Sequence, residues 1–225
     1  MQVNPNVSIM SIPASLAVSK MRMPEVEEPI TKRNIFVPPT DEPKHANALH
    51  AFSDGAWTGL LVAGMIVANI LVIIAVVAMI NALLGWLGGF FQVPQLSITF
   101  LAGYILYPVA ALLGIPNGEI YLVAQLIGTK IVQNEFVAYT SLSSETQYTS
   151  MSTRSQLIAT YALCGFGNIS ALGIQIGVLG QLGPGKKPVF AQVALSALVA
   201  GVLATLTSAS VAGMVLTGEY ALSGS

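Results

Sequence analysis

Charged side chains are scarce in this sequence. Only 8% of its 225 residues are Asp, Glu, Lys or Arg, against about 25% in soluble domains. A soluble protein must cover its surface with polar groups, yet 54% of these residues are hydrophobic and the mean hydropathy is +0.72. The composition therefore excludes an ordinary soluble globular protein.

The shortage of cysteine, histidine and basic clusters excludes further classes. The single cysteine, Cys164, permits no intramolecular disulfide and no multi-cysteine metal site. His45 and His50 have no acidic or cysteine ligands in a metal-binding pattern around them, so we expect no resident metal or cofactor. A net charge of −1 without a basic cluster argues against a nucleic-acid partner. The apolar stretches hold neither histidine nor aspartate, and we expect no enzyme.

What the sequence does have is long uncharged runs. Residues 55–118 form 64 consecutive positions without a charged side chain, and residues 155–185 and 188–218 form two more runs of 31. About 20 apolar residues in a helix cross the hydrocarbon core of a bilayer. The sequence therefore predicts an all-α integral membrane protein in contact with lipid.

The runs and their polar interruptions predict the order of the segments. We expect the end of a truncated transmembrane helix at 1–19, a polar cytoplasmic connector at 20–54 and a C-terminal membrane region at 55–225, itself divided into a long helix at 56–91, an interfacial segment at 94–115, a hairpin at 119–148, a broken helix at 154–182 and a last helix at 189–217.

The sides of the membrane follow from lysine and arginine. The connector carries five of them and the turn after the broken helix carries Lys186 and Lys187, which predicts that both lie in the cytoplasm. The stretch Gly59–Leu87 would be about 43 Å long as a helix, longer than the roughly 30 Å core. We therefore expect a long scaffold helix there that is strongly tilted or protrudes from the membrane.

The hairpin prediction depends on two charges in an apolar stretch. Ile120–Leu142 is long enough to cross, but it carries Lys130 and Glu135 near its middle. One charge at the centre of a crossing helix costs at least about 2.5–3.5 kcal/mol. A re-entrant hairpin avoids this cost by burying its polar break in protein, and it keeps both basic loops on one side. The alternative is that Glu135 pairs with Lys130 and merely ties two helices together.

A second polar break is predicted in the segment at 154–182. Glycines flank Phe166, and Asn168 and Ser170 follow, which weakens helix and predicts a discontinuous transmembrane helix. Polar breaks near mid-membrane suit a small polar solute. A carboxylate such as Glu135 accepts hydrogen bonds from vicinal hydroxyls, an amide such as Asn168 both donates and accepts, and Phe166 packs on a ring. The candidate substrate-binding residues are therefore Glu135, Phe166, Asn168 and Ser170.

Three strings carry a resemblance to a known family. Residues 128–139 (GTKIVQNEFVAY), 154–168 (RSQLIATYALCGFGN) and 8–16 (SIMSIPASL) resemble the concentrative nucleoside transporters, in that family's order. The resemblance covers nearly the whole chain and corresponds to the family's C-terminal half.

The resemblance implies a cation-coupled nucleoside symporter, usually sodium-driven, that works in the plasma membrane as a homotrimer by an elevator motion. It implies that Glu135 and Asn168 hold the ribose, with Phe166 beside the site. The family has a serine three residues after the asparagine, where this chain has Ala171. Gly167 replaces the more usual alanine.

The family's other half supplies base recognition and most of the sodium site. We therefore expect this chain to be incompetent for coupled transport by itself, and preference for purine or pyrimidine and for sodium or proton stays open. The alternative is a non-transporting truncated or accessory membrane protein with a structural role.

Overall fold

The computed structural model describes residues 5–24, 26 and 46–215, and within them the secondary structure is helical, without strands. The helices are α1 (Pro5–Arg22), α2 (Ala48–Phe90), α3 (Ile98–Ile105), α4 (Tyr107–Leu112), α5 (Ile120–Val132), α6 (Glu135–Ser144), α7 (Thr146–Thr149), α8 (Thr153–Leu163), α9 (Ile169–Leu182), the 3₁₀ turn η1 (Pro184–Lys186) and α10 (Lys187–Val215).

Two of the described helices, α2 and α10, are long and apolar enough to cross a membrane. The most apolar stretch of α2 is only 6% buried within the molecule and that of α10 only 17%. Helices with so much uncovered apolar surface are stable in lipid, where apolar side chains need no protein partner. This confirms the all-helical membrane class that the sequence predicts.

The first two predicted boundaries differ from the observed ones. Helix α1 continues past residue 19 to Arg22, and α2 begins at Ala48, inside the predicted connector. The early start of α2 has a local cause. Asn47 accepts a hydrogen bond from the His50 backbone N–H at 2.8 Å, and His50 lies 3.1 Å from Asp54 one turn later. Most of the predicted connector, residues 27–45, lies outside the described residues.

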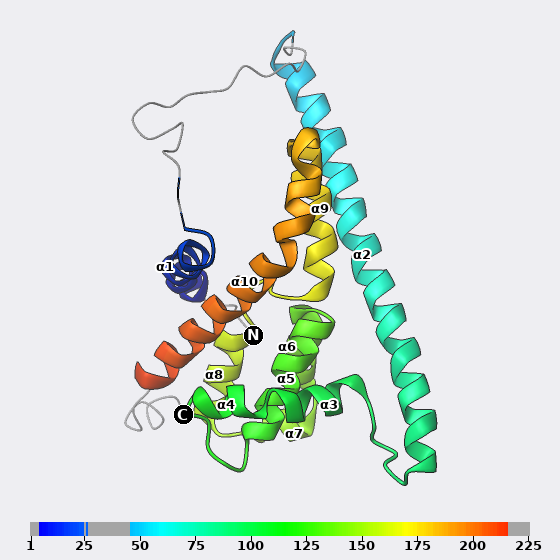
Figure 1. The fold of residues 1–225 in the computed structure, drawn as a ribbon, viewed down its shortest axis with the longest axis vertical. Helices are drawn as coiled ribbons and strands as arrows, with labels where there is room; N and C mark the ends of the chain where they lie inside the picture. The colour runs from blue at the N-terminus through cyan, green and yellow to red at the C-terminus, as the bar shows by residue number, and fades with distance from the viewer. Residues whose placement is uncertain (1–4, 25, 27–45, 216–225) are drawn as a thin grey trace.

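The helices are arranged along one side of α2 (Figure 1). Helix α9 packs between α2 and α10, and α1 packs on the far side of α10. The short helices α3 and α4 lie across the end of the molecule where the α5–α6 hairpin begins. Helix α8 approaches from that same end and α9 continues beyond the break, so the broken helix runs beside the hairpin.

The most tightly packed region surrounds α5. Lipid is as apolar as leucine, so helix association in a membrane depends on close packing rather than on hydrophobic burial. Gly128 on α5 meets α3 so closely that an added Cβ would lie 2.5 Å from the Cβ of Ala102, and Gly103 on α3 packs under Tyr121. The largest fully buried apolar side chains of this core are Val123, Leu126, Ile127, Ile158 and Leu163.

The Gly128–Ala102 contact predicts a matched pair of variants. Gly128→Ala should push α3 away from α5 and lower the stability by about 1–3 kcal/mol, the usual cost of overpacking. Gly85→Ala on α2 meets nothing within 4 Å and should leave stability unchanged or slightly raised. The midpoint of thermal unfolding in detergent tests both, and equal midpoints would contradict the packing.

Candidate functional site

The α5–α6 hairpin is interrupted at its tip. Helix α5 ends at Val132, two residues follow, and α6 begins at Glu135. Asn134 is extended, and its Oδ1 accepts a hydrogen bond from the Val137 backbone N–H at 2.9 Å. This cap satisfies a backbone donor that the break would otherwise leave unpaired. Glu135 therefore occupies the first turn of α6, where the helix dipole favours a negative charge.

The neighbouring helix is interrupted in the same way. Helix α8 ends at Leu163 and α9 begins at Ile169, after five residues without helix. Gly165 has a φ of +106°, which L side chains rarely adopt, and it lies against Thr205 of α10. Asn168 caps α9, since its Oδ1 accepts from the Ala171 backbone N–H at 2.7 Å. The discontinuity that the Gly-Phe-Gly-Asn string predicts is present.

The two interruptions meet through side chains. The amide Nδ2 of Asn168 donates to Oε2 of Glu135 at 2.7 Å, and the Ser170 hydroxyl donates to Oδ1 of Asn168 at 2.9 Å. All three residues are buried, at 7%, 2% and 3% exposure for Glu135, Asn168 and Ser170. Because the cap occupies Oδ1 of Asn168, its NH₂ group is the part left to face the carboxylate. The result is a buried polar cluster at the point where the two interruptions meet.

Lys130 does not make the ion pair that the alternative interpretation requires. Its Nζ donates to the Ala162 carbonyl at 2.8 Å and contacts Oγ1 of Thr205 at 3.4 Å, and no ion pair joins it to Glu135 in the described part of the chain. Ala162 lies 32 residues further along the sequence. A partner at that separation leaves no local pattern in the sequence, so the sequence analysis did not predict the contact between Lys130 and Ala162.

Phe166 lies apart from the polar cluster. Its ring is 69% exposed. It borders a cavity of about 370 Å³ whose walls come from α1, the break, α9 and α10. Of the four predicted site residues, the structure thus joins Glu135, Asn168 and Ser170 directly, and it places Phe166 on an open face of the same break.

The base of the hairpin is held by a second polar contact. The Glu119 carboxylate accepts hydrogen bonds from the Ser152 backbone N–H at 2.7 Å and from the Ser152 hydroxyl at 2.6 Å. Burial raises the pKa of Glu119, but the hydrogen bonds from Ser152 and Ser155 lower it by more, so this pKa lies below its usual value of 4.5. The hairpin is therefore attached to the broken helix at its base and at its tip.

This combination defines a class of protein. Interrupted helices whose polar ends meet within an integral membrane protein are typical of secondary transporters. The family model described as "Na+ dependent nucleoside transporter C-terminus" matches residues 6–213. The chain belongs to this family, as its motifs predict, and it corresponds to the C-terminal part of such a transporter.

Individual relatives agree with this assignment. Sodium/nucleoside cotransporter 1 of Sus scrofa is 40% identical over 92% of this chain, and solute carrier family 28 member 3 of Eptatretus stoutii is 38% identical over 94% of it. The chain spans about a third of the length of these curated relatives, 34% and 33% respectively.

Solved structures of one transporter share the fold. The structure of CNTnw in an inward-facing substrate-bound state matches 92% of this chain with 31% identity and a TM-score of 0.73. An intermediate state of a CNTnw variant matches 93% with 32% identity and a TM-score of 0.80. The chain covers 48% and 50% of those two structures.

The double role of Asn168 predicts an unequal response to two substitutions. Asn168→Asp keeps an oxygen that can cap α9 but places a second carboxylate beside Glu135. Asn168→Ser also keeps a capping oxygen and adds no charge. We expect the Asp variant to be less stable than the Ser variant by roughly 1–3 kcal/mol, measured by thermal unfolding. Adding Glu135→Gln should restore the Asp variant. Equal stability of the two single variants would contradict the assigned amide orientation.

Proposed function

We propose that this chain is the ribose-binding C-terminal part of a cation-coupled nucleoside symporter, with sodium as the expected coupling ion. The observation that carries the proposal is the buried hydrogen bond between Glu135 and Asn168 at the meeting point of two helix breaks. A carboxylate in such a place needs donors to offset its lost hydration, and a sugar supplies them.

The chemistry of the cluster fits vicinal hydroxyls. A carboxylate has about four acceptor positions, and Asn168 takes one of them on Oε2 of Glu135. The 2′ and 3′ hydroxyls of a ribose would each donate to the remaining positions. The Ser170 hydroxyl donates to Asn168 and retains lone pairs that accept from the sugar. Ala171 offers no hydroxyl at the next position, where the family resemblance implies a serine that contacts ribose, so the site would make one hydrogen bond fewer there.

Phe166 would contact the nucleoside through its ring rather than through hydrogen bonds. Its exposed ring lies two residues before Asn168 and provides an apolar face for the nucleoside. Stacking of a base on an aromatic ring contributes about 1–3 kcal/mol and tolerates any base. Phe166 would therefore add affinity without selecting purine over pyrimidine.

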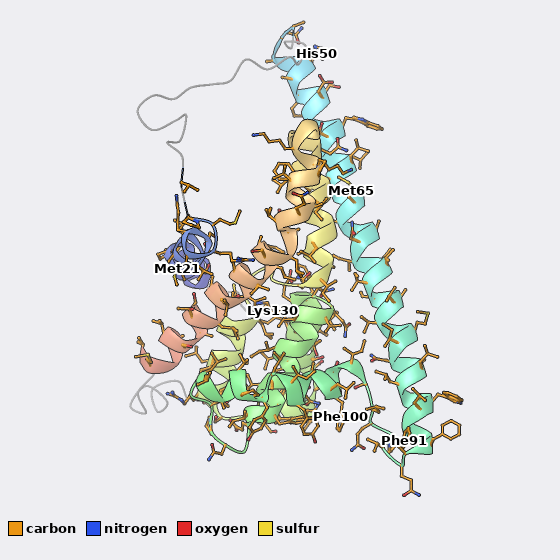
Figure 2. The ribbon with its side chains drawn as sticks, viewed as in Figure 1. Met21, His50, Met65, Phe91, Phe100 and Lys130 are labelled. Atoms are coloured by element: carbon orange, nitrogen blue, oxygen red, sulfur yellow. The ribbon has the colours of Figure 1, made fainter. Side chains whose placement is uncertain are left out.

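The proposed membrane arrangement follows from the same elements. The α5–α6 hairpin would enter and leave the bilayer on one side, because its tip is buried in protein and needs no water. The hairpin and broken helix would move together along α2 as the elevator. Helix α9 meets α2 through glycines, with Gly173 against Asn69 and Gly177 against Met65, which Figure 2 labels beside α9. The glycines at these positions let α9 approach the side chains of α2 closely.

We further propose that the assembled transporter is a homotrimer in the plasma membrane. Its partners would be the nucleoside, the coupling cation and surrounding lipid, and we infer that the chain is not an enzyme, since the family consists of transporters.

Glu135→Gln tests the ribose site in the complete protein that contains this chain. Wild type should bind uridine or adenosine more tightly than the matching 2′,3′-dideoxynucleoside, because only the ribose hydroxyls donate to the carboxylate. Hydrogen bonds to a charged acceptor are worth about 1.5–3 kcal/mol. Glu135→Gln should lower this discrimination by about tenfold to about a hundredfold, measured by calorimetry in lipid nanodiscs. Unchanged discrimination would refute the ribose site.

The competing function is that of a non-transporting truncated or accessory membrane protein. Uptake of radiolabelled uridine and adenosine separates the two. Residues 1–225 expressed by themselves should give no concentrative uptake, and the reading frame upstream should encode further spans with a second polar hairpin that restores it. A complete open reading frame without such spans, together with absent uptake, would favour the structural role.

A further inference from the structure

Lys130 is a buried cation that has no role in the proposed ribose site. It is the largest fully buried side chain of the described residues, at 1% exposure, and Figure 2 places it at the centre of the helix cluster. Burying an ammonium without compensation is costly, so its contacts must replace most of its hydration. Those contacts are the Ala162 carbonyl at 2.8 Å and the Thr205 hydroxyl at 3.4 Å.

The position of Ala162 in α8 explains why a cation is favoured at this contact. Ala162 lies in the last turn of α8, where backbone carbonyls lack helical partners and carry the negative end of the helix dipole. The Lys130 ammonium therefore compensates the carboxyl end of the first half-helix. Thr205, its second partner, belongs to α10 and also packs against Gly165 in the break.

Glu135 has the complementary position on the second half-helix. It accepts from the side chain of Asn168, the cap of α9, so an anion lies at the amino end of that half-helix. Both charges come from one hairpin, Lys130 before the tip and Glu135 just after it. Each of the two half-helix ends at the break thus faces the charge that its dipole favours, and the two charges sum to zero.

We propose that Lys130 is a positioning residue for the nucleoside site, which fixes the hairpin on the carboxyl end of α8 and so sets the place where the Glu135 carboxylate meets Asn168 and the ribose. This inference rests on the proposed function of Glu135. Together the two residues form a charge clamp, defined as Lys130 on Ala162 and Glu135 on Asn168, that spans the break from both ends.

The test must separate positioning from simple support of the fold. A destabilised protein binds less nucleoside in total, but its folded fraction discriminates between nucleosides as before. The ratio of the dissociation constants for a dideoxynucleoside and the matching ribonucleoside is therefore insensitive to folded fraction. It reports whether the Glu135 carboxyl group is still in place to accept the ribose hydroxyls.

Two variants of Lys130 in the complete protein provide the measurement. Lys130→Met keeps the length and removes charge and donor, whereas Lys130→Gln keeps a donor without charge. Without the ammonium, the hairpin loses its contact with the carboxyl end of α8, so Glu135 is expected to turn away from the position in which it meets Asn168. Both variants should lower the discrimination by at least about tenfold.

Lys186→Met is the matched control. Lys186 is exposed in the turn before α10, and its replacement should leave the discrimination at the wild-type value. Wild-type discrimination in folded Lys130→Met and Lys130→Gln would overturn the proposal. Loss of discrimination in Lys186→Met as well would overturn it too, because the effect would then not be specific to Lys130.

A charge-balanced double variant covers the case in which Lys130→Met fails to fold. Lys130→Met leaves Glu135 without a compensating charge, while Lys130→Met combined with Glu135→Gln removes both charges. We expect the double variant to unfold at a higher temperature than Lys130→Met alone. A double variant no more stable than the single one would overturn the clamp. Failure of the ribose site would show separately, as unchanged discrimination in Glu135→Gln.

Discussion

The structure depends on one hydrogen bond between two broken helices, the bond from the Asn168 amide to the Glu135 carboxylate. Each residue begins or caps a half-helix, so the contact brings two helix amino ends together at one point. Backbone groups at helix ends need partners, and in lipid water does not supply them. The Asn134 and Asn168 caps satisfy backbone N–H groups at the two breaks, and the bond between the Asn168 and Glu135 side chains joins the two capped ends.

The surrounding packing serves to hold that meeting point. Gly128 lets α3 approach α5, Gly165 lets α10 approach the break, and Glu119 attaches the base of the hairpin to the start of α8. None of these contacts depends on hydrophobic burial, which has little value against an apolar solvent. Close helix contacts and satisfied polar groups stabilise the structure instead. Both fix the relative positions of the helices more strongly than hydrophobic burial does.

The need for partners at helix ends also governs where the two buried charges lie. Lys130 and Glu135 lie at opposite ends of the break in α8 and α9, and each contacts the half-helix end whose dipole it offsets. A cation and an anion brought by one hairpin leave the buried region neutral without direct contact between them. Under the proposed function, the Glu135 carboxylate would accept the hydroxyl donors of a ribose. The long apolar helix α2, by contrast, offers α9 a surface with few polar contacts.

The sequence by itself determined the membrane class, both breaks and the family, because these depend on local composition and on strings of adjacent residues. Uncharged runs indicate lipid, and Gly-Phe-Gly-Asn disfavours helix wherever it lies. Only the tertiary structure decided which polar groups meet. Lys130 contacts Ala162 rather than Glu135, and Phe166 faces outward from a break whose Asn168 faces inward. Such pairings depend on how helices far apart in the chain pack, and no local preference of a residue encodes them.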